Sequence, residues 1–175
     1  MVKSVQLVLM VIVLAAVAGC GVQKSVTKFV GLGGDDLTVY SGPMYPATSK
    51  IAIAFQPAQV GRSCRVFAES LALFPANVTG KDIEASVLAE AGKRGADQVL
   101  VGQTRQGADD EGLQFLYYGP KNEYLCADQC GGWKFGFSFW EKQGHWVPLG
   151  YGEWGKATTR FETPLVMQMA MLRCQ

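Results

Sequence analysis

Apolar residues of this chain fall into separate runs, and the spacing within each run predicts a strand or a helix. Residues 50–55 alternate large apolar and small side chains, a pattern typical of a strand. Residues 64–74 form a mostly apolar run that ends at Pro75 and predict a second strand, although residues 68–73 also fit a helix.

The clearest helix signal follows these two runs. Thr79 is a candidate N-cap, and Asp82 lies where a carboxylate favours the positive end of the helix dipole. Gly95 is placed to end the helix in the left-handed conformation, and residues 96–102 then predict a buried strand. The apolar residues at helical spacing, which predict one buried face, are Ile83, Val87, Leu88 and Ala91.

The remaining sequence predicts further strands and a second helix. Residues 113–118 form an apolar run, and residues 133–139 alternate aromatic rings with Lys, Gly or Ser. A turn at 142–145 and a returning strand at 146–154 would complete a hairpin, with Pro148 at an edge or a bulge. Pro164 fits the first turn of a C-terminal helix with apolar positions Leu165, Met169 and Leu172. We expect an α+β fold in which a small antiparallel or mixed sheet is packed by one main helix and this C-terminal helix.

The first twenty residues have the pattern of an export signal. Lys3 precedes an apolar run over residues 5–17 that only Gln6 interrupts, and the run ends in Val17-Ala18-Gly19-Cys20. Small residues followed by cysteine resemble the lipobox of bacterial lipoproteins. The resemblance implies cleavage before Cys20 and acylation of Cys20, which would hold the protein on a membrane without a spanning helix. The alternative is an uncleaved transmembrane anchor, for which an apolar stretch of about 15 residues is short.

This interpretation divides the chain into three parts. Residues 1–19 are the signal peptide, residues 20–48 are the lipidated Cys20 with a flexible tether, and residues 49–175 are a single α+β periplasmic domain. The tether is predicted from the glycines of 31–34 and from Ser41-Gly42-Pro43, where apolar residues are sparse.

The charge balance argues against nucleic acid as a partner. The chain has 16 Lys and Arg against 15 Asp and Glu, and removal of residues 1–19 would remove one basic residue, Lys3, and leave the two signs equal. Proteins that bind nucleic acid normally carry a basic patch or stripe.

The cysteines agree with export to an oxidising compartment. Four of them follow Cys20, namely Cys64, Cys126, Cys130 and Cys174. An even set in an exported chain predicts two disulfides. Cys126 and Cys130 are close enough in sequence to pair with each other, which would leave Cys64 for Cys174, but the crossed pairings stay open.

Catalytic motifs are not found in the sequence. His145 is the only histidine and falls in a predicted turn, and Asp109-Asp110-Glu111 is typical of a solvated loop. A Cys-x₃-Cys pair without a nearby histidine supplies too few ligands for a zinc site. We therefore expect no enzyme activity, no cofactor and no metal.

Aromatic residues crowd the second half of the chain and provide candidate binding residues. A sheet packed on a helix would bury part of them, but more large rings are present than one sheet face needs. Trp and Tyr are favoured in protein interfaces. The candidates for a partner or ligand surface are Trp133, Trp140, Trp146, Tyr151 and Trp154.

A second resemblance covers part of the domain. Gly61-Arg62-Ser63-Cys64, the predicted helix, and the stretch Lys93-Arg94-Gly95-Ala96-Asp97-Gln98-Val99 are similar to Rcs-stress-sensor-type outer-membrane lipoproteins and to related small lipoproteins of unknown function. The sensor has a cysteine after the strand that follows the helix, where this chain has Gln103 and Thr104. The resemblance implies a compact α+β domain on a lipid anchor, and it does not carry over a disulfide pattern.

Together these patterns predict a lipid-anchored protein of the cell envelope that acts by binding another envelope protein. Gly21 after Cys20, in place of Asp, favours the outer membrane over retention at the inner membrane. The alternative function is a small-ligand-binding or lysozyme-inhibitor-type lipoprotein.

Overall fold

The computed structural model describes residues 40–130 and 137–174. These residues belong to the compact unit Gly34–Gln175. The predicted signal peptide, Cys20, most of the predicted tether and Trp133 lie outside the described residues. No helix within the described residues is long and apolar enough to cross a membrane.

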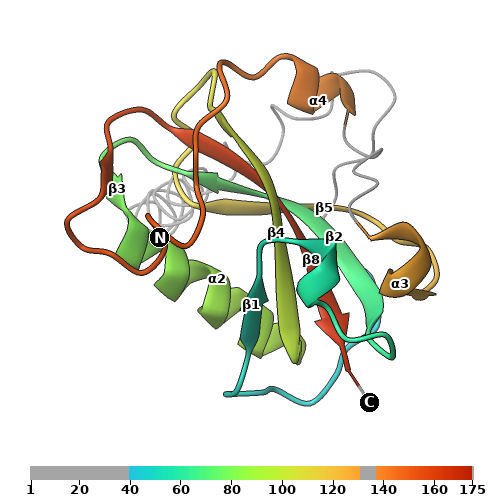
Figure 1. Cartoon of the computed structure of the whole chain (residues 1–175). Helices are drawn as coiled ribbons and strands as arrows, with labels where there is room; N and C mark the ends of the chain where they lie inside the picture. The colour runs from blue at the N-terminus through green and yellow to red at the C-terminus, as the bar shows by residue number, and fades with distance from the viewer. Residues whose placement is uncertain (1–39, 131–136, 175) are drawn as a thin grey trace, which may run out of the picture. The chain divides into compact units, whose positions relative to one another are not determined.

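The described chain forms a mixed sheet with one main helix, which confirms the α+β prediction (Figure 1). The strand order is β1-β4-β8-β2-β5, with β6 also paired to β2, and β3 and β7 form a separate two-stranded sheet. Among the strands of the described residues, only β1 and β4 pair in parallel. The elements are β1 (Ala52–Ala54), a 3-10 helix η1 (Pro57–Gln59), β2 (Arg65–Phe74), β3 (Val78–Thr79), α2 (Gly80–Arg94), β4 (Gln98–Gln106), β5 (Gln114–Gly119), β6 (Tyr124–Leu125), α3 (Cys126–Gln129), α4 (Phe137–Glu141), β7 (Arg160–Phe161) and β8 (Leu165–Arg173).

The main core lies between α2 and one face of the sheet. Ile83, Val87 and Ala91 of α2 are fully buried in the same cluster as Phe67, Val99, Val101 and the three methionines of β8. The other sheet face carries two smaller clusters, one around the cysteines and one under Trp140. The central strands β2 and β8 are therefore buried on both faces, with Arg65 and Arg173 as their only residues that are not fully buried.

Local sequence accounts for both ends of α2, as predicted. The Thr79 hydroxyl accepts from the Asp82 backbone N–H, and the Asp82 carboxylate accepts from the Thr79 N–H at 3.1 Å. This reciprocal pair satisfies two backbone donors at the start of the helix. Gly95 ends the helix with φ 79°, a conformation that glycine adopts without steric cost.

The predicted C-terminal helix is instead the strand β8. Leu165, Met169 and Leu172 fit a helical spacing, but every residue from Leu165 to Leu172 is buried. A strand with neighbours on both edges and packing on both faces is apolar throughout, so it has no alternation to identify it. β8 pairs with both β2 and β4, and these two ladders decide its conformation.

The predicted hairpin of residues 133–154 is also absent where the structure describes it. Residues 131–136 lie outside the described part, and Phe137–Glu141 form the short helix α4. Trp146 makes an isolated bridge to Arg105 of β4, residues 147–149 have no regular structure, and residues 150–155 form a bend and turns. Proline and glycine at positions 148, 150 and 152 interrupt a regular ladder there.

Residues 40–48, assigned to the tether from the sequence, pack on the domain, and we call this segment the strap. Tyr45 contacts Phe67 edge to face with ring centroids 5.1 Å apart, and Tyr40 lies against Tyr117 at 4.8 Å. The Thr48 N–H donates to the Gly92 carbonyl at 3.1 Å. Side chains at Gly92 or Gly95 would collide with the strap backbone, since an added Cβ would lie 2.8 Å from Thr48 O or 2.5 Å from Pro46 O.

Candidate functional site

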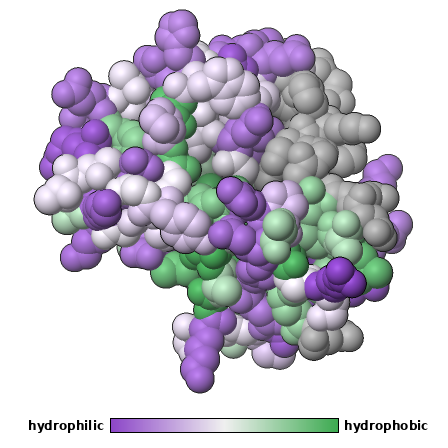
Figure 2. All heavy atoms as spheres, in the orientation of Figure 1, coloured by the Kyte–Doolittle hydropathy of each residue, from purple (hydrophilic) through white to green (hydrophobic). Residues whose placement is uncertain are grey.

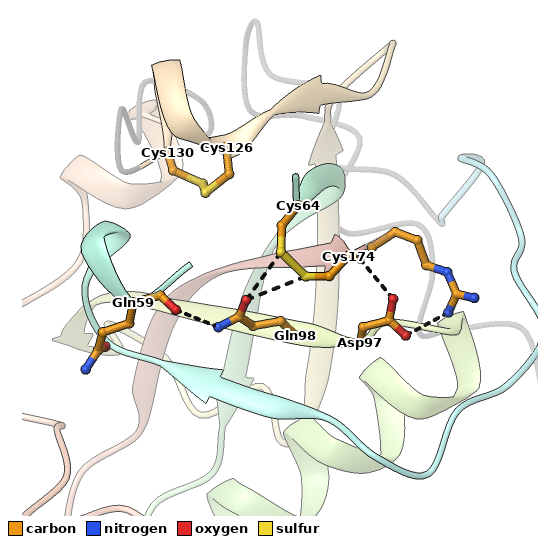
Figure 3. Close-up of a disulfide and its surroundings, with 8 residues drawn as sticks. Gln59, Cys64, Asp97, Gln98, Cys126, Cys130 and Cys174 are labelled. Atoms are coloured by element: carbon orange, nitrogen blue, oxygen red, sulfur yellow. Dashed lines mark hydrogen bonds and ion pairs between the residues drawn. A yellow bond between two sulfur atoms is a disulfide. The ribbon is translucent and has the colours of Figure 1, made fainter. Parts of the chain in front are cut away.

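The four candidate cysteines form two disulfides, Cys64–Cys174 and Cys126–Cys130. The pairing is the uncrossed one of the alternatives left open by the sequence. Both disulfides belong to one apolar cluster on the sheet face opposite α2, and the Cys126 N–H donates to the Cys64 carbonyl at 3.0 Å. Figure 3 shows the two pairs on neighbouring segments.

Polar groups lie close around the Cys64–Cys174 disulfide (Figure 3). The Gln98 side-chain oxygen lies 3.7 Å from each sulfur, and its amide nitrogen donates to the Gln59 carbonyl at 3.2 Å. Asp97 accepts from the Cys174 N–H and from the Arg173 guanidinium, each at 2.9 Å. This arrangement fixes β8 beside β4 and is typical of a structural disulfide.

The candidate aromatic residues separate into buried and exposed groups. Trp140 is 4% exposed and packs on Leu71, Leu73 and Val166, so the prediction that it presents its ring to a partner is wrong. α4 lays this ring on the β2–β8 face. Trp154 is half-buried against the main core. Trp146 and Tyr151 are 59% and 64% exposed and remain as surface candidates.

Trp146 forms a cluster with Arg105 and Trp140 that sequence reasoning did not predict. The Arg105 guanidinium lies 5.3 Å from the Trp146 ring centroid and 5.6 Å from that of Trp140. The two indoles meet edge to face with centroids 5.9 Å apart. Arg105 donates to the carbonyls of Gly144 and Trp140, both at 2.8 Å. The bridge between Trp146 and Arg105 of β4 brings these three side chains together, and no local sequence motif predicts the cluster.

Tyr151 has a different environment, without a cation in ring contact among the described residues. Its ring contacts Phe55 edge to face at 4.5 Å, and its hydroxyl accepts from the Gln59 amide at 2.8 Å. Hydropathy does not reveal either exposed ring. Figure 2 shows, on the face of the molecule seen in Figure 1, patches of apolar residues between hydrophilic ones. Tyrosine and tryptophan have intermediate values on such a hydropathy scale, so colour alone does not mark them.

A buried carboxyl lies on the sheet face opposite α2. Glu69 is 5% exposed, and one of its oxygens accepts from the Tyr124 hydroxyl at 2.6 Å. Its other oxygen and the side-chain oxygen of Gln168 have no hydrogen-bond partner within the described part of the chain. Burial raises the pKa of Glu69, and the hydrogen bond from Tyr124 opposes this change. Glu69 is an acidic residue inside the mostly apolar run 64–74, and this position was the sequence signal that could have predicted a buried carboxyl.

No protein-family model, curated protein or solved structure matches this chain.

Proposed function

We propose that this protein is a lipid-anchored component of the bacterial cell envelope that acts by binding another envelope protein rather than by catalysis. The exposed Trp146 ring is the observation that carries the proposal. The Trp146 indole is 59% exposed and contacts Arg105, which also contacts Trp140. Exposed tryptophan is among the residue types that contribute most binding energy to protein interfaces.

The anchoring part of the proposal rests on Val17-Ala18-Gly19-Cys20. Two acyl chains at one cysteine give stable membrane attachment, because each buried CH₂ contributes about 0.8 kcal/mol. Two disulfides in the described domain support export, since disulfides persist in oxidising compartments. Gly21 favours the outer membrane.

The anchoring test is chemical. Globomycin treatment, or Cys20→Ala, should leave an unprocessed precursor or a form that lacks lipid, seen as altered electrophoretic mobility and loss of the protein from the membrane fraction. Unchanged mobility and unchanged membrane partition under both conditions would reject the lipid anchor.

The binding test uses photo-crosslinking in living cells. A photoreactive benzoylphenylalanine in place of Trp146 should give a discrete adduct with one envelope protein. The matched control places the same residue at Lys81, which is exposed at the start of α2. Equal adducts from both positions, or none from position 146, would contradict a partner surface at Trp146. Tight binding of one small metabolite in place of any protein would favour the ligand-binding alternative.

A further inference from the structure

The half-buried arginines of the described domain differ in their counter-charges. Arg65, Arg94 and Arg173 each have a carboxylate within ion-pair distance, supplied by Glu123, Glu90 and Asp97 respectively. Arg105 has no such ion pair within the described part of the chain. Its partners are two backbone carbonyls and two indole rings, so no carboxylate of the described residues neutralises its positive charge.

Arg94 also contacts two aromatic rings, and unlike Arg105 it has a carboxylate partner among the described residues as well. Its guanidinium lies 4.5 Å from the ring centroid of Tyr40 and 5.3 Å from that of Tyr117, much as Arg105 lies between Trp140 and Trp146. In addition, the Glu90 carboxylate accepts from Arg94 Nε at 2.8 Å. Two rings, one guanidinium and one carboxylate thus join the strap to α2 and β5.

The cluster at Arg105 repeats the rings and the guanidinium and lacks the carboxylate. The two hydrogen-bonded carbonyls belong to Trp140 of α4 and to Gly144 of the segment that follows it, so the guanidinium is held in place from one side. Trp140 is buried, whereas Trp146 is 59% exposed. A purely structural clamp needs the two carbonyls and the Trp140 ring, and it does not account for an exposed second indole.

We propose that Arg105 and Trp146 form a recognition site for a carboxylate attached to an apolar group, presented by the partner protein, so that the partner supplies to Arg105 what Glu90 supplies to Arg94. A guanidinium recognises a carboxylate through charge-assisted hydrogen bonds. The exposed indole provides apolar contact area for the adjoining group. The inference rests on the proposed function, because it assigns chemistry to the partner of the same surface.

The test uses phenylacetate as the probe, with the chain from residue 20 carrying Cys20→Ala. In an NMR titration, the indole N–H of Trp146 and the Nε–H of Arg105 should shift and saturate with phenylacetate. Benzyl alcohol lacks the carboxylate and acetate lacks the ring, and each should bind about tenfold more weakly, because each loses one of the two contacts.

Variants locate the site. Trp146→Ala and Arg105→Gln should each remove the saturable shifts, and Arg105→Lys, which keeps the charge without the planar fork, should weaken binding. Tyr151→Ala removes a similarly exposed ring that no arginine of the described residues contacts, and it should leave the titration unchanged. Arg105 also holds the segment after α4, so Arg105→Gln could unfold the domain. In that case the Trp146→Ala titration alone decides between the outcomes.

The proposal would be overturned if benzyl alcohol bound with the same affinity as phenylacetate. It would also be overturned if Trp146→Ala still bound phenylacetate. The two failures are distinguishable. Loss of the cross-link at position 146 with intact phenylacetate binding would reject the protein partner, whereas a cross-link without carboxylate preference would reject the chemistry assigned to Arg105.

Discussion

Cys64 lies opposite Cys174 across the two central strands. Arg65 pairs with Arg173 at the ends of β2 and β8, so the disulfide continues their ladder by one residue pair. The bond joins positions 110 residues apart, and Gln98 of the neighbouring β4 contacts both sulfurs. The disulfide thus joins the same ends of β2 and β8, and the Gln98 contact brings that end of β4 beside them.

Removal of this disulfide should destabilise the domain strongly. For Cys64→Ala with Cys174→Ala, we expect the free energy of unfolding to fall by about 5 kcal/mol, because a long loop is released in the unfolded chain. Urea denaturation of the non-lipidated protein measures the change. The matched control is Cys126→Ala with Cys130→Ala, which opens a loop of sequence separation 4. It should cost about 2 kcal/mol. An equal effect of the two pairs would contradict the role assigned to the first.

Glu69 should make stability depend on pH. Because burial raises its pKa in the folded protein above the ordinary value of 4.5, the folded state binds more protons. The free energy of unfolding should therefore fall as pH rises from 4.5 through the folded pKa, and then level off.

The neutral variant Glu69→Gln should remove this part of the pH dependence, with unfolding curves compared from about pH 4, below the ordinary value of 4.5, to about pH 8. Tyr124→Phe is a useful second variant, since it removes the hydroxyl that stabilises the ionised form. It should steepen the loss of stability with rising pH. Identical slopes for Glu69→Gln and the parent chain would show that Glu69 ionises normally.

Gly95→Ala should release the strap. The substitution forces alanine into the left-handed region at φ 79° and places its Cβ 2.5 Å from the Pro46 carbonyl oxygen. We expect a loss of about 1–2 kcal/mol from the backbone conformation and faster chymotrypsin cleavage beside Tyr40 or Tyr45. The control is Gly152→Ala, where an added Cβ has open space. Slow cleavage in both variants would contradict the contact between the strap and α2.

The two indoles of the Arg105 cluster should differ in their effect on stability. Trp140→Ala removes a buried ring beneath α4 and should cost about 3–5 kcal/mol. Trp146→Ala removes a mostly exposed ring and should cost less than about 1 kcal/mol. Thermal unfolding of both variants compares them directly. Similar costs would place Trp146 in the core rather than on the surface.

Local sequence determined α2 well, because its signals lie within a few residues of the atoms that they affect. Thr79 and Asp82 satisfy each other's backbone donors, and Gly95 has the conformation expected of a helix-ending glycine. The strands β2 and β4 were predicted in place because their apolar runs are bounded by turns or by proline.

The sequence could not reveal features that depend on distant neighbours. Met167 and Met169 are good helix formers, and only the ladders with β2 and β4 make their segment a strand. The exposure of Trp146 and the burial of Trp140 follow from how residues 137–147 cross the end of β4, which neither residue's local pattern determines. Arg105 acquired its two rings in the same way.

The central position of β8 has a consequence for how the protein folds. The sheet cannot close until a strand about a hundred residues downstream of β2 has been made, and contacts so far apart in sequence form slowly. Until then β2 and β4 keep unpaired edges with apolar side chains on both faces, which is the condition in which chains aggregate. A nascent chain of this protein therefore needs to be kept extended and protected until β8 arrives, a requirement that export as an unfolded chain would meet.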